Sequence, residues 1–167
     1  MKERTCCFTG HRLINRSDFD SIKAEVKKAV IALINKGVIF FGAGGALGFD
    51  TIAAESVLEL KESFQQIKLI LVLPCKNQTR GWSDYDVKRY NDILRRTDKV
   101  VYVSEQYYDG CMQKRNRHLI DNSGYCICYL KRNSGGTAYT VNYAIKNGLT
   151  VYNVAKKYGE PVITNSP

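Results

Sequence analysis

Short apolar runs alternate along the chain with longer segments in which apolar residues recur every three or four positions. The apolar residues of the first long segment lie at the spacing of one helical face: Phe19, Ile22, Val26, Val30 and Leu33. Segments with this spacing predict helices over 18–36, 50–63, 84–96, 111–122 and 137–146. The apolar runs predict strands over 4–9, 38–41, 67–73, 99–103, 125–130 and 150–154.

The regular alternation of strands and helices indicates the fold class. Consecutive strand–helix–strand units are expected to cross over right-handedly, which produces a parallel sheet with helices on both faces. We therefore expect an α/β, Rossmann-like three-layer fold with a mainly parallel sheet. A chain of 167 residues without a linker, repeat or low-complexity tract is expected to form one domain over residues 1–167. Ligands of such sheets bind outside the carboxyl ends of the strands, so the loops that follow strands are the candidates for a site.

Composition supports a packed core and indicates the compartment. Hydrophobic residues make up 44% of the chain and aromatic residues 11%, which excludes a disordered chain. No apolar run approaches the roughly 18 to 20 residues that a membrane-spanning helix needs. The apolar run after the first four residues is too short for a signal peptide. We expect a cytoplasmic protein without a membrane partner.

The six cysteines fit that compartment as free thiols. No Cys-x-x-Cys pair occurs, and neither histidine lies at zinc-ligand spacing from a pair of cysteines. We interpret the cysteines as small core residues and expect no metal site.

The chain carries a net charge of +9. Two interpretations stay open. The basic residues are scattered over predicted helices and loops, which favours a solvated basic surface. An anionic partner, including nucleic acid, is the alternative.

Two loops near the N-terminal half carry candidate binding residues. Thr9, Gly10, His11 and Arg12 follow the first strand and combine a turn glycine with three side-chain donors. The second loop, 42–50, has four glycines in its first seven positions, namely Gly42, Gly44, Gly45 and Gly48. Its backbone amides and the helix start behind them favour an anion. Asp50 is expected to be the N-cap of that helix. A turn required only for tight packing is the alternative.

A third loop after the fifth strand repeats this design with Ser134, Gly135, Gly136 and Thr137. Two such loops after strands of one parallel sheet are expected to meet at the same edge. Neither loop holds a Walker lysine, and the second departs from Gly-x-Gly-x-x-Gly by one inserted residue, so neither a P-loop NTPase nor an ordinary nicotinamide dehydrogenase is expected. At the start of the fourth helix, Arg115 and Asn116 are candidates for phosphate or ribose contacts.

These segments, with Gln78, Trp82 and Met112 between them, occur in an order that resembles the YpsA-like family of the SLOG superfamily, which is named after the Smf/DprA and Lonely Guy proteins. The resemblance spans nearly the whole chain. It implies a Rossmann-like fold and a nucleotide or nucleotide-derived ligand such as ADP-ribose, NAD or an AMP-like molecule. It also makes a homo-oligomer an expectation. Trp82 is expected to pack on the core rather than to close over a ligand, and Tyr107 and Tyr108 are stacking candidates.

Three functions follow from the residues and the resemblance. The first is nucleotide binding, with a sensing role, by these expected contacts: Thr9, Gly10, His11, Arg12, Gly42, Gly44, Gly45, Gly48, Asp50, Arg115, Asn116, Ser134, Gly135, Gly136 and Thr137. The second is phosphoribohydrolase activity on nucleoside monophosphates, as in Lonely Guy enzymes. No catalytic residue is assigned, because Thr140 stands where those enzymes have their glutamate, and Asp50 and Asp121 are the carboxylates near the loops. The third is binding of single-stranded nucleic acid.

Overall fold

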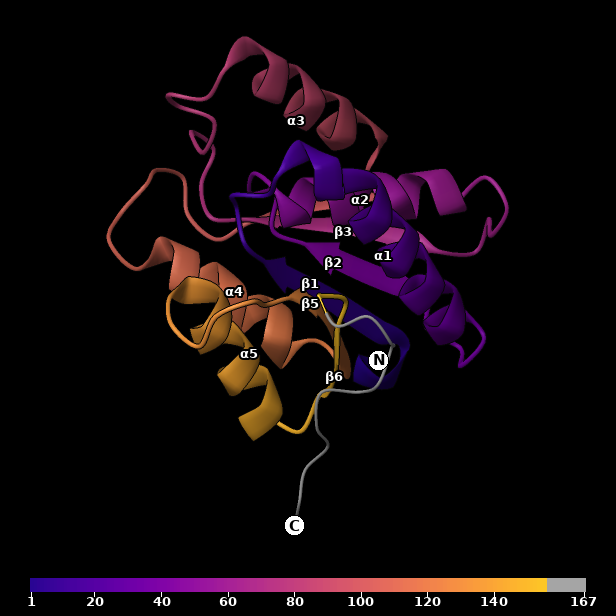
Figure 1. Cartoon of the computed structure of the whole chain (residues 1–167). Coiled ribbons are helices and arrows are strands. Elements are labelled where there is room, and N and C mark those ends of the chain that lie inside the picture. The colour runs from indigo at the N-terminus through magenta and orange to yellow at the C-terminus, as the bar shows by residue number, and fades with distance from the viewer. Residues whose placement is uncertain (156–167) are drawn as a thin grey trace.

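Six parallel strands form one sheet across the molecule (Figure 1). The structure is a computed structural model, and it describes residues 1–155. Its sheet has the order β4-β3-β2-β1-β5-β6, and every neighbouring pair is parallel. The strands are β1 (Thr5–Gly10), β2 (Phe40–Ala43), β3 (Lys68–Leu73), β4 (Lys99–Tyr102), β5 (Tyr125–Tyr129) and β6 (Thr150–Asn153). The predicted Rossmann-like fold with a parallel sheet is confirmed.

Helices cover both faces of the sheet (Figure 1). One face carries α1 (Phe19–Ile34) and α2 (Phe49–Leu60), with α3 (Asp84–Arg96) packed beside α2. The other face carries α4 (Cys111–Asp121) and α5 (Gly136–Lys146), which pack against each other. Two short 3-10 helices, η1 (Lys2–Arg4) and η2 (Arg16–Asp18), precede β1 and α1. All five predicted helices and all six predicted strands are present, with ends that differ by a few residues.

Side chains of the central strands alternate between two apolar cores, as the period of a β-strand requires. Cys6 and Phe8 of β1 belong to the larger core under α1 and α2. Cys7, between them, belongs to the smaller core under α4 and α5, together with Cys126 and Cys128 of β5. All six cysteines are free thiols and are buried, so their predicted use as small core residues is confirmed.

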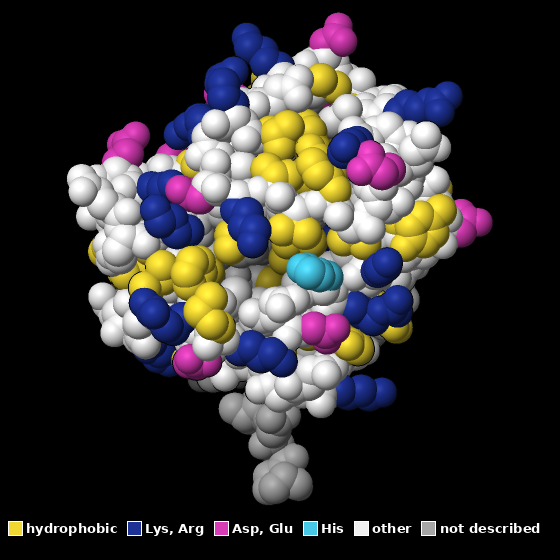
Figure 2. Space-filling view, turned by 180° about the vertical axis from the view of Figure 1, so that it is seen from behind, with side chains coloured by type: hydrophobic (Ala, Val, Ile, Leu, Met, Phe, Trp, Pro, Cys, Tyr) yellow, Lys and Arg dark blue, Asp and Glu magenta, His cyan; other side chains and the backbone are white. Residues whose placement is uncertain are grey.

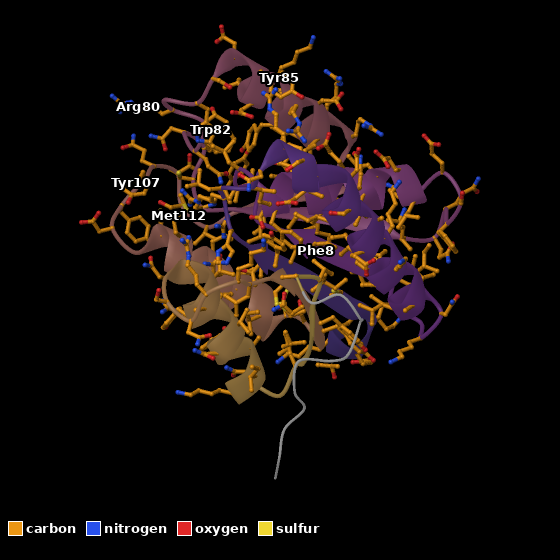
Figure 3. All side chains as sticks on the ribbon, viewed as in Figure 1. Phe8, Arg80, Trp82, Tyr85, Tyr107 and Met112 are labelled. Carbon is orange, nitrogen blue, oxygen red and sulfur yellow. The ribbon has the colours of Figure 1, made fainter. Side chains whose placement is uncertain are left out.

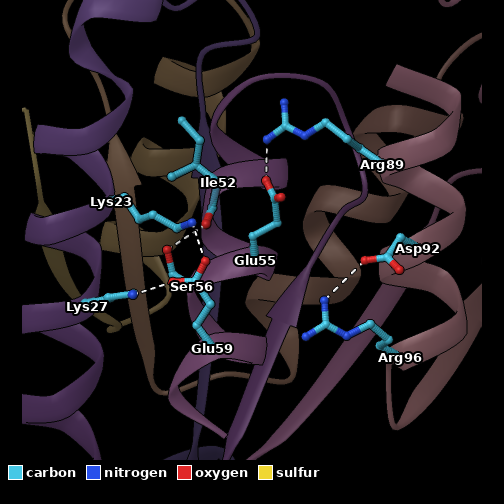
Figure 4. Close-up of polar contacts among 9 residues, drawn as sticks. All are labelled: Lys23, Lys27, Ile52, Glu55, Ser56, Glu59, Arg89, Asp92 and Arg96. Carbon is cyan, nitrogen blue, oxygen red and sulfur yellow. Dashed lines mark hydrogen bonds and ion pairs between the residues drawn. The ribbon is translucent and has the colours of Figure 1, made fainter. Parts of the chain in front are cut away.

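Ion pairs connect the outer surfaces of α1, α2 and α3 (Figure 4). Glu59 of α2 binds both Lys23 and Lys27 of α1, and Glu55 of α2 binds Arg89 of α3. These groups are partly exposed to solvent, and pairs of this kind each contribute about 0 to 1 kcal/mol. The packing of the apolar faces, rather than these pairs, therefore holds the helices on the sheet. Among residues 1–155, no helix is long and apolar enough to span a membrane.

The chain adds β2, β3 and β4 in turn on one side of β1, and then crosses to the other side of β1 to add β5 and β6. The chain leaves β1 toward α1 on one face of the sheet, and it leaves β5 toward α5 on the other face. The two connections therefore diverge at the carboxyl ends of these neighbouring strands, and they leave a crevice between them. This topology fixes where a ligand site can form.

Candidate functional site

A cavity of about 840 Å³ lies at the carboxyl ends of β1 and β5, where the two connections diverge. It is formed by the end of β1 and the following loop, the start of α2, the first turns of α4, and the loop between β5 and α5 with the start of α5. Its lining residues are Thr9, Gly10, His11, Arg12, Leu13, Ala46, Asp50, Met112, Gln113, Arg115, Asn116, Arg132, Ser134, Gly135, Gly136, Thr137 and Tyr139. The first and third candidate loops of the sequence therefore meet at one cavity.

The residues expected to contact a ligand divide into two groups. Those that line the cavity are Thr9, Gly10, His11, Arg12, Asp50, Arg115, Asn116, Ser134, Gly135, Gly136 and Thr137. Four glycines of the loop after β2, namely Gly42, Gly44, Gly45 and Gly48, do not line it. Trp82, Tyr107, Tyr108 and Thr140 do not line it either. Figure 3 shows Arg80 and Tyr107 at the periphery of the molecule, and Trp82 packs edge-on against Tyr90.

The glycines of the loop after β2 allow close packing against other segments. A Cβ on Gly44 would overlap the guanidinium of Arg115, and a Cβ on Gly48 would overlap the backbone of Arg12. A Cβ on Gly45 would meet the side chain of Leu73. These contacts support the alternative that this loop is glycine-rich because it must pack tightly.

The carboxylate of Asp50 binds to the backbone of this loop. The prediction that Asp50 is the N-cap of α2 is wrong, because Gly48 is the N-cap and Asp50 lies in the first turn. Its buried carboxylate accepts a hydrogen bond from the backbone N–H of Ala46 at 3.2 Å and is also stabilised by the N–H of Gly44. The loop thus binds an anion, as its composition indicates, but that anion is the Asp50 carboxylate of the chain itself.

Arg115 connects α4 to the same loop. Its Nη1 donates to the carbonyl oxygen of Gly44, and its Nε donates to Oδ1 of Asn116 at 2.7 Å. Only 3% of the residue is exposed. Two of its three nitrogens therefore have oxygen partners within the chain, and the guanidinium forms part of the cavity wall.

The charges of Asp50 and Arg115 are both disfavoured by burial. Burial raises the pKa of Asp50, and the positive charge of Arg115 opposes that rise. Burial likewise lowers the pKa of Arg115, and the charge of Asp50 opposes that fall. The two shifts agree that the loss of hydration outweighs the mutual attraction of these groups.

His11 joins the ends of β1 and β5. Its Nε2 accepts a hydrogen bond from the backbone N–H of Lys131 at 2.9 Å, so the neutral ring carries its proton on Nδ1. Burial lowers the pKa of His11, and the positive charges of Arg132 and Lys131 lower it further. A neutral His11 therefore positions the start of the loop that leads to α5.

The start of α5 has no side chain that caps it. Its N-cap is Gly135, whose φ of +94° turns the chain into the helix without a capping side chain. Arg132, three residues earlier, is exposed and lines the same cavity, as does Arg12 from the opposite loop. Within residues 1–155 neither arginine has an ion-pair partner. This end of the cavity therefore combines a helix start that no side chain caps with two arginines that have no ion-pair partner among residues 1–155.

Several residues that line the cavity were not among those selected from the sequence. Of the two carboxylates expected near the loops, Asp50 lines the cavity and Asp121 does not. Leu13, Ala46, Gln113, Arg132 and Tyr139 line the cavity, and only their nearness to the candidate loops could have indicated them. Asp121, expected near the loops, is the last residue of α4, and its carboxylate accepts the hydroxyl of Tyr143. Asp50 is therefore the single carboxylate among the residues that line the cavity.

We expect Gly48→Ala to lower the free energy of unfolding by about 2 to 4 kcal/mol, because the residue has φ of +77° and its Cβ would overlap the backbone of Arg12. Gly37→Ala is the matched control, because Gly37 has φ of +93° but has no neighbouring atom within 4 Å of its Cβ position. The control is expected to lose about 1 to 2 kcal/mol. Urea unfolding of both variants measures the difference, and equal losses would contradict the packing role of Gly48.

We expect the stability difference between the wild type and Asp50→Asn to favour the wild type increasingly as pH falls from 7 toward 4. The pKa of Asp50 is raised above its ordinary value of 3.8, so the folded state binds the proton more tightly than the unfolded state. The resulting stabilisation is complete below the unfolded pKa and is lost as pH rises through the folded pKa. Urea unfolding at several pH values checks this. A difference that is constant, or that shrinks on acidification, would contradict it.

Known proteins resemble this chain in both sequence and structure. The UPF0398 protein BH1768 of Halalkalibacterium halodurans is 32% identical over 135 residues, which cover 79% of this chain and 71% of that protein. The UPF0398 protein YpsA of Bacillus subtilis is 26% identical over 128 residues, which cover 75% and 71%.

Two solved structures of DNA processing protein A (DprA) share the fold. That of Streptococcus pneumoniae superposes with a TM-score of 0.64 at 17% identity, over 89% of this chain and 49% of that protein. That of Helicobacter pylori, described for its single-stranded DNA binding mode, superposes with a TM-score of 0.64 at 18% identity, over 91% and 65%. The chain thus spans about half of the first DprA and less than two thirds of the second. The sequence model YpsA, which describes the YspA SLOG family, matches residues 7–156. The chain therefore belongs to the YspA SLOG family.

Proposed function

We propose that the cavity between β1 and β5 binds a nucleotide or a nucleotide-derived ligand through its phosphate. One observation carries the proposal: the uncapped start of α5 opens into the cavity beside Arg12 and Arg132, which have no ion-pair partner in the described part of the chain. A phosphate accepts hydrogen bonds from helix-start amides and is favoured there by the helix dipole. Arginine adds charge-assisted hydrogen bonds.

The size and composition of the cavity support a ligand larger than phosphate alone. Its volume of about 840 Å³ lies within the range of small-molecule sites, roughly 300 to 1,000 Å³. Polar groups beyond the phosphate end, among them Thr9, Asn116 and the carboxylate of Asp50, are suited to hydroxyl groups such as those of a ribose. AMP, ADP-ribose and NAD are therefore the ligand classes to which we assign the site, and a sensing role is the matching function.

The geometry supports binding better than hydrolysis. Thr140, at the position of the glutamate in Lonely Guy enzymes, donates its hydroxyl proton to the carbonyl of Gly136 and does not line the cavity. Asp50 is held by amides of its own loop, and burial raises its pKa. Its carboxylate is thus less available to activate water or to stabilise a developing positive charge.

Single-stranded nucleic acid is the second candidate, and it is favoured by the net charge of +9 and by the described DNA-binding mode of the Helicobacter pylori DprA. The distribution of charge over the surface argues against nucleic-acid binding. On the face drawn in Figure 2, the lysine and arginine side chains are separated by other residues and do not form a continuous stripe. Such a stripe is what tracks a phosphate backbone.

We expect Arg132→Ala to weaken the binding of AMP or ADP-ribose about ten- to hundredfold, because a hydrogen bond to a charged group contributes about 1.5 to 3 kcal/mol. Arg132 is exposed, so its removal should leave the fold unchanged. Arg80→Ala removes the same charge from an exposed residue outside the cavity and is expected to have no effect. Isothermal titration calorimetry with each variant measures the affinities. Equal loss in both variants, or no binding by the wild type, would refute the proposal.

For the second candidate, we expect the affinity for an oligothymidylate to fall on the order of tenfold or more between about 50 and 200 mM salt, since each neutralised phosphate releases bound counterions. Fluorescence anisotropy of a labelled oligonucleotide checks this. Undetectable binding at low salt, or affinity that salt does not change, would remove nucleic acid as a partner.

A further inference from the structure

The rim of the cavity carries three large apolar side chains among lining residues that are otherwise polar or small: Leu13, Met112 and Tyr139. They come from three different elements, namely the loop after β1, the first turn of α4 and the first turn of α5. Met112 is engaged within the chain, because its sulfur lies 3.7 Å from Nη2 of Arg12 and 3.9 Å from Nη2 of Arg115. Leu13 and Tyr139 are the two that remain open to a ligand.

Leu13 is exposed to an unusual degree for its type. It is 89% exposed, whereas the next residue, Ile14, packs against the larger core. Leu13 borders the main cavity on one side and a smaller hollow of about 370 Å³ on the other. The loop therefore holds an apolar side chain at the cavity mouth, where nothing in the described part of the chain covers it.

Tyr139 lines the same cavity from the first turn of α5. It is 48% exposed, and no residue among 1–155 stacks on its ring or binds its hydroxyl. Tyr143, one turn further along α5, differs because its hydroxyl donates to Asp121. A ring that is partly desolvated and unpaired next to an anion site is suited to stacking with a planar group.

The distance from the start of α5, where the phosphate is proposed to bind, indicates which part of the ligand these side chains would contact. Tyr139 lies three residues after Gly136 in α5, which corresponds to a rise of about 4.5 Å along the helix axis. A ribose that joins a phosphate to a base bridges a separation of this order. Leu13 lines the same cavity from the loop after β1, and Tyr139 lines it from α5.

We infer that Tyr139 and Leu13 hold the planar base of the ligand, and that the site therefore takes a nucleotide rather than a sugar phosphate or inorganic phosphate. This inference rests on the proposed function, because it assigns the phosphate of the same ligand to the start of α5. Stacking on an aromatic ring tolerates any base, since every base has a π-face. Affinity thus depends on the presence of a base more than on its identity.

Binding of AMP and of ribose 5-phosphate to the full chain tests the inference, because the two ligands share a phosphate and differ in the base. We expect the wild type to bind AMP at least tenfold more tightly than ribose 5-phosphate. Tyr139→Ala should weaken AMP binding by about tenfold or more and leave ribose 5-phosphate unchanged, whereas Tyr139→Phe should retain AMP affinity. Tyr107→Ala is the control, because Tyr107 is 57% exposed but lies outside the cavity.

Nuclear magnetic resonance supplies a readout that does not depend on affinity alone. The methyl signals of Leu13, identified by their loss in Leu13→Ala, are expected to shift through the ring current of the base on addition of AMP but not of ribose 5-phosphate. If ribose 5-phosphate binds the wild type as tightly as AMP, or if Tyr139→Ala binds AMP normally, the inference is wrong while the proposed phosphate site stands. If neither ligand binds the wild type, the proposed function itself is wrong.

Discussion

The loop after β2 is held by two buried opposite charges, and the shape of the cavity depends on them. Asp50 accepts a hydrogen bond from the N–H of Ala46, and Arg115 donates one to the carbonyl oxygen of Gly44 from α4 on the other face of the sheet. The backbone of one loop, at Gly44 and Ala46, thus connects a guanidinium and a carboxylate. Burial disfavours both charges, and their mutual attraction offsets only part of the lost hydration. The same two residues therefore line the cavity, and the raised pKa of Asp50 makes the stability of the fold depend on pH.

This arrangement separates the roles of two loops that look alike in the sequence. Both are rich in glycine, and both precede a helix. In the loop after β2 the amides are used by Asp50, and the glycines admit Arg115 and the backbone of Arg12. In the loop after β5 the helix start is uncapped and a Cβ on Gly135 or Gly136 would meet no atom within 4 Å. The second loop thus has open space where the first has protein, and this is why the proposed phosphate is assigned to the second loop.

The sequence predicts the layered fold because strand and helix periods are local properties, visible in runs such as Phe19 to Leu33. It also indicates which strand ends matter, because parallel strands present their carboxyl ends at one edge. It does not indicate that Asp50 turns back onto Ala46 instead of capping α2, since an aspartate near a helix start satisfies both patterns. Nor does it select Tyr139 or Arg132, whose place in the cavity wall follows from the packing of α5 against β1.

The distribution of charge favours a small anion over a long one. A net charge of +9 spread over the surface attracts any polyanion weakly, and its effect is screened over about 10 Å at 0.1 M salt. Within the cavity, by contrast, Arg12, Arg115 and Arg132 face one carboxylate, and the start of α5 adds its partial positive charge. Arg115 and Asp50 are buried, where electrostatic interactions are stronger than in water, whereas Arg12 and Arg132 are exposed at the same cavity. Under the proposed function we therefore expect the largest gain in free energy from a phosphate that enters the cavity. A nucleic-acid strand would reach that position only by inserting a terminal or flipped-out nucleotide.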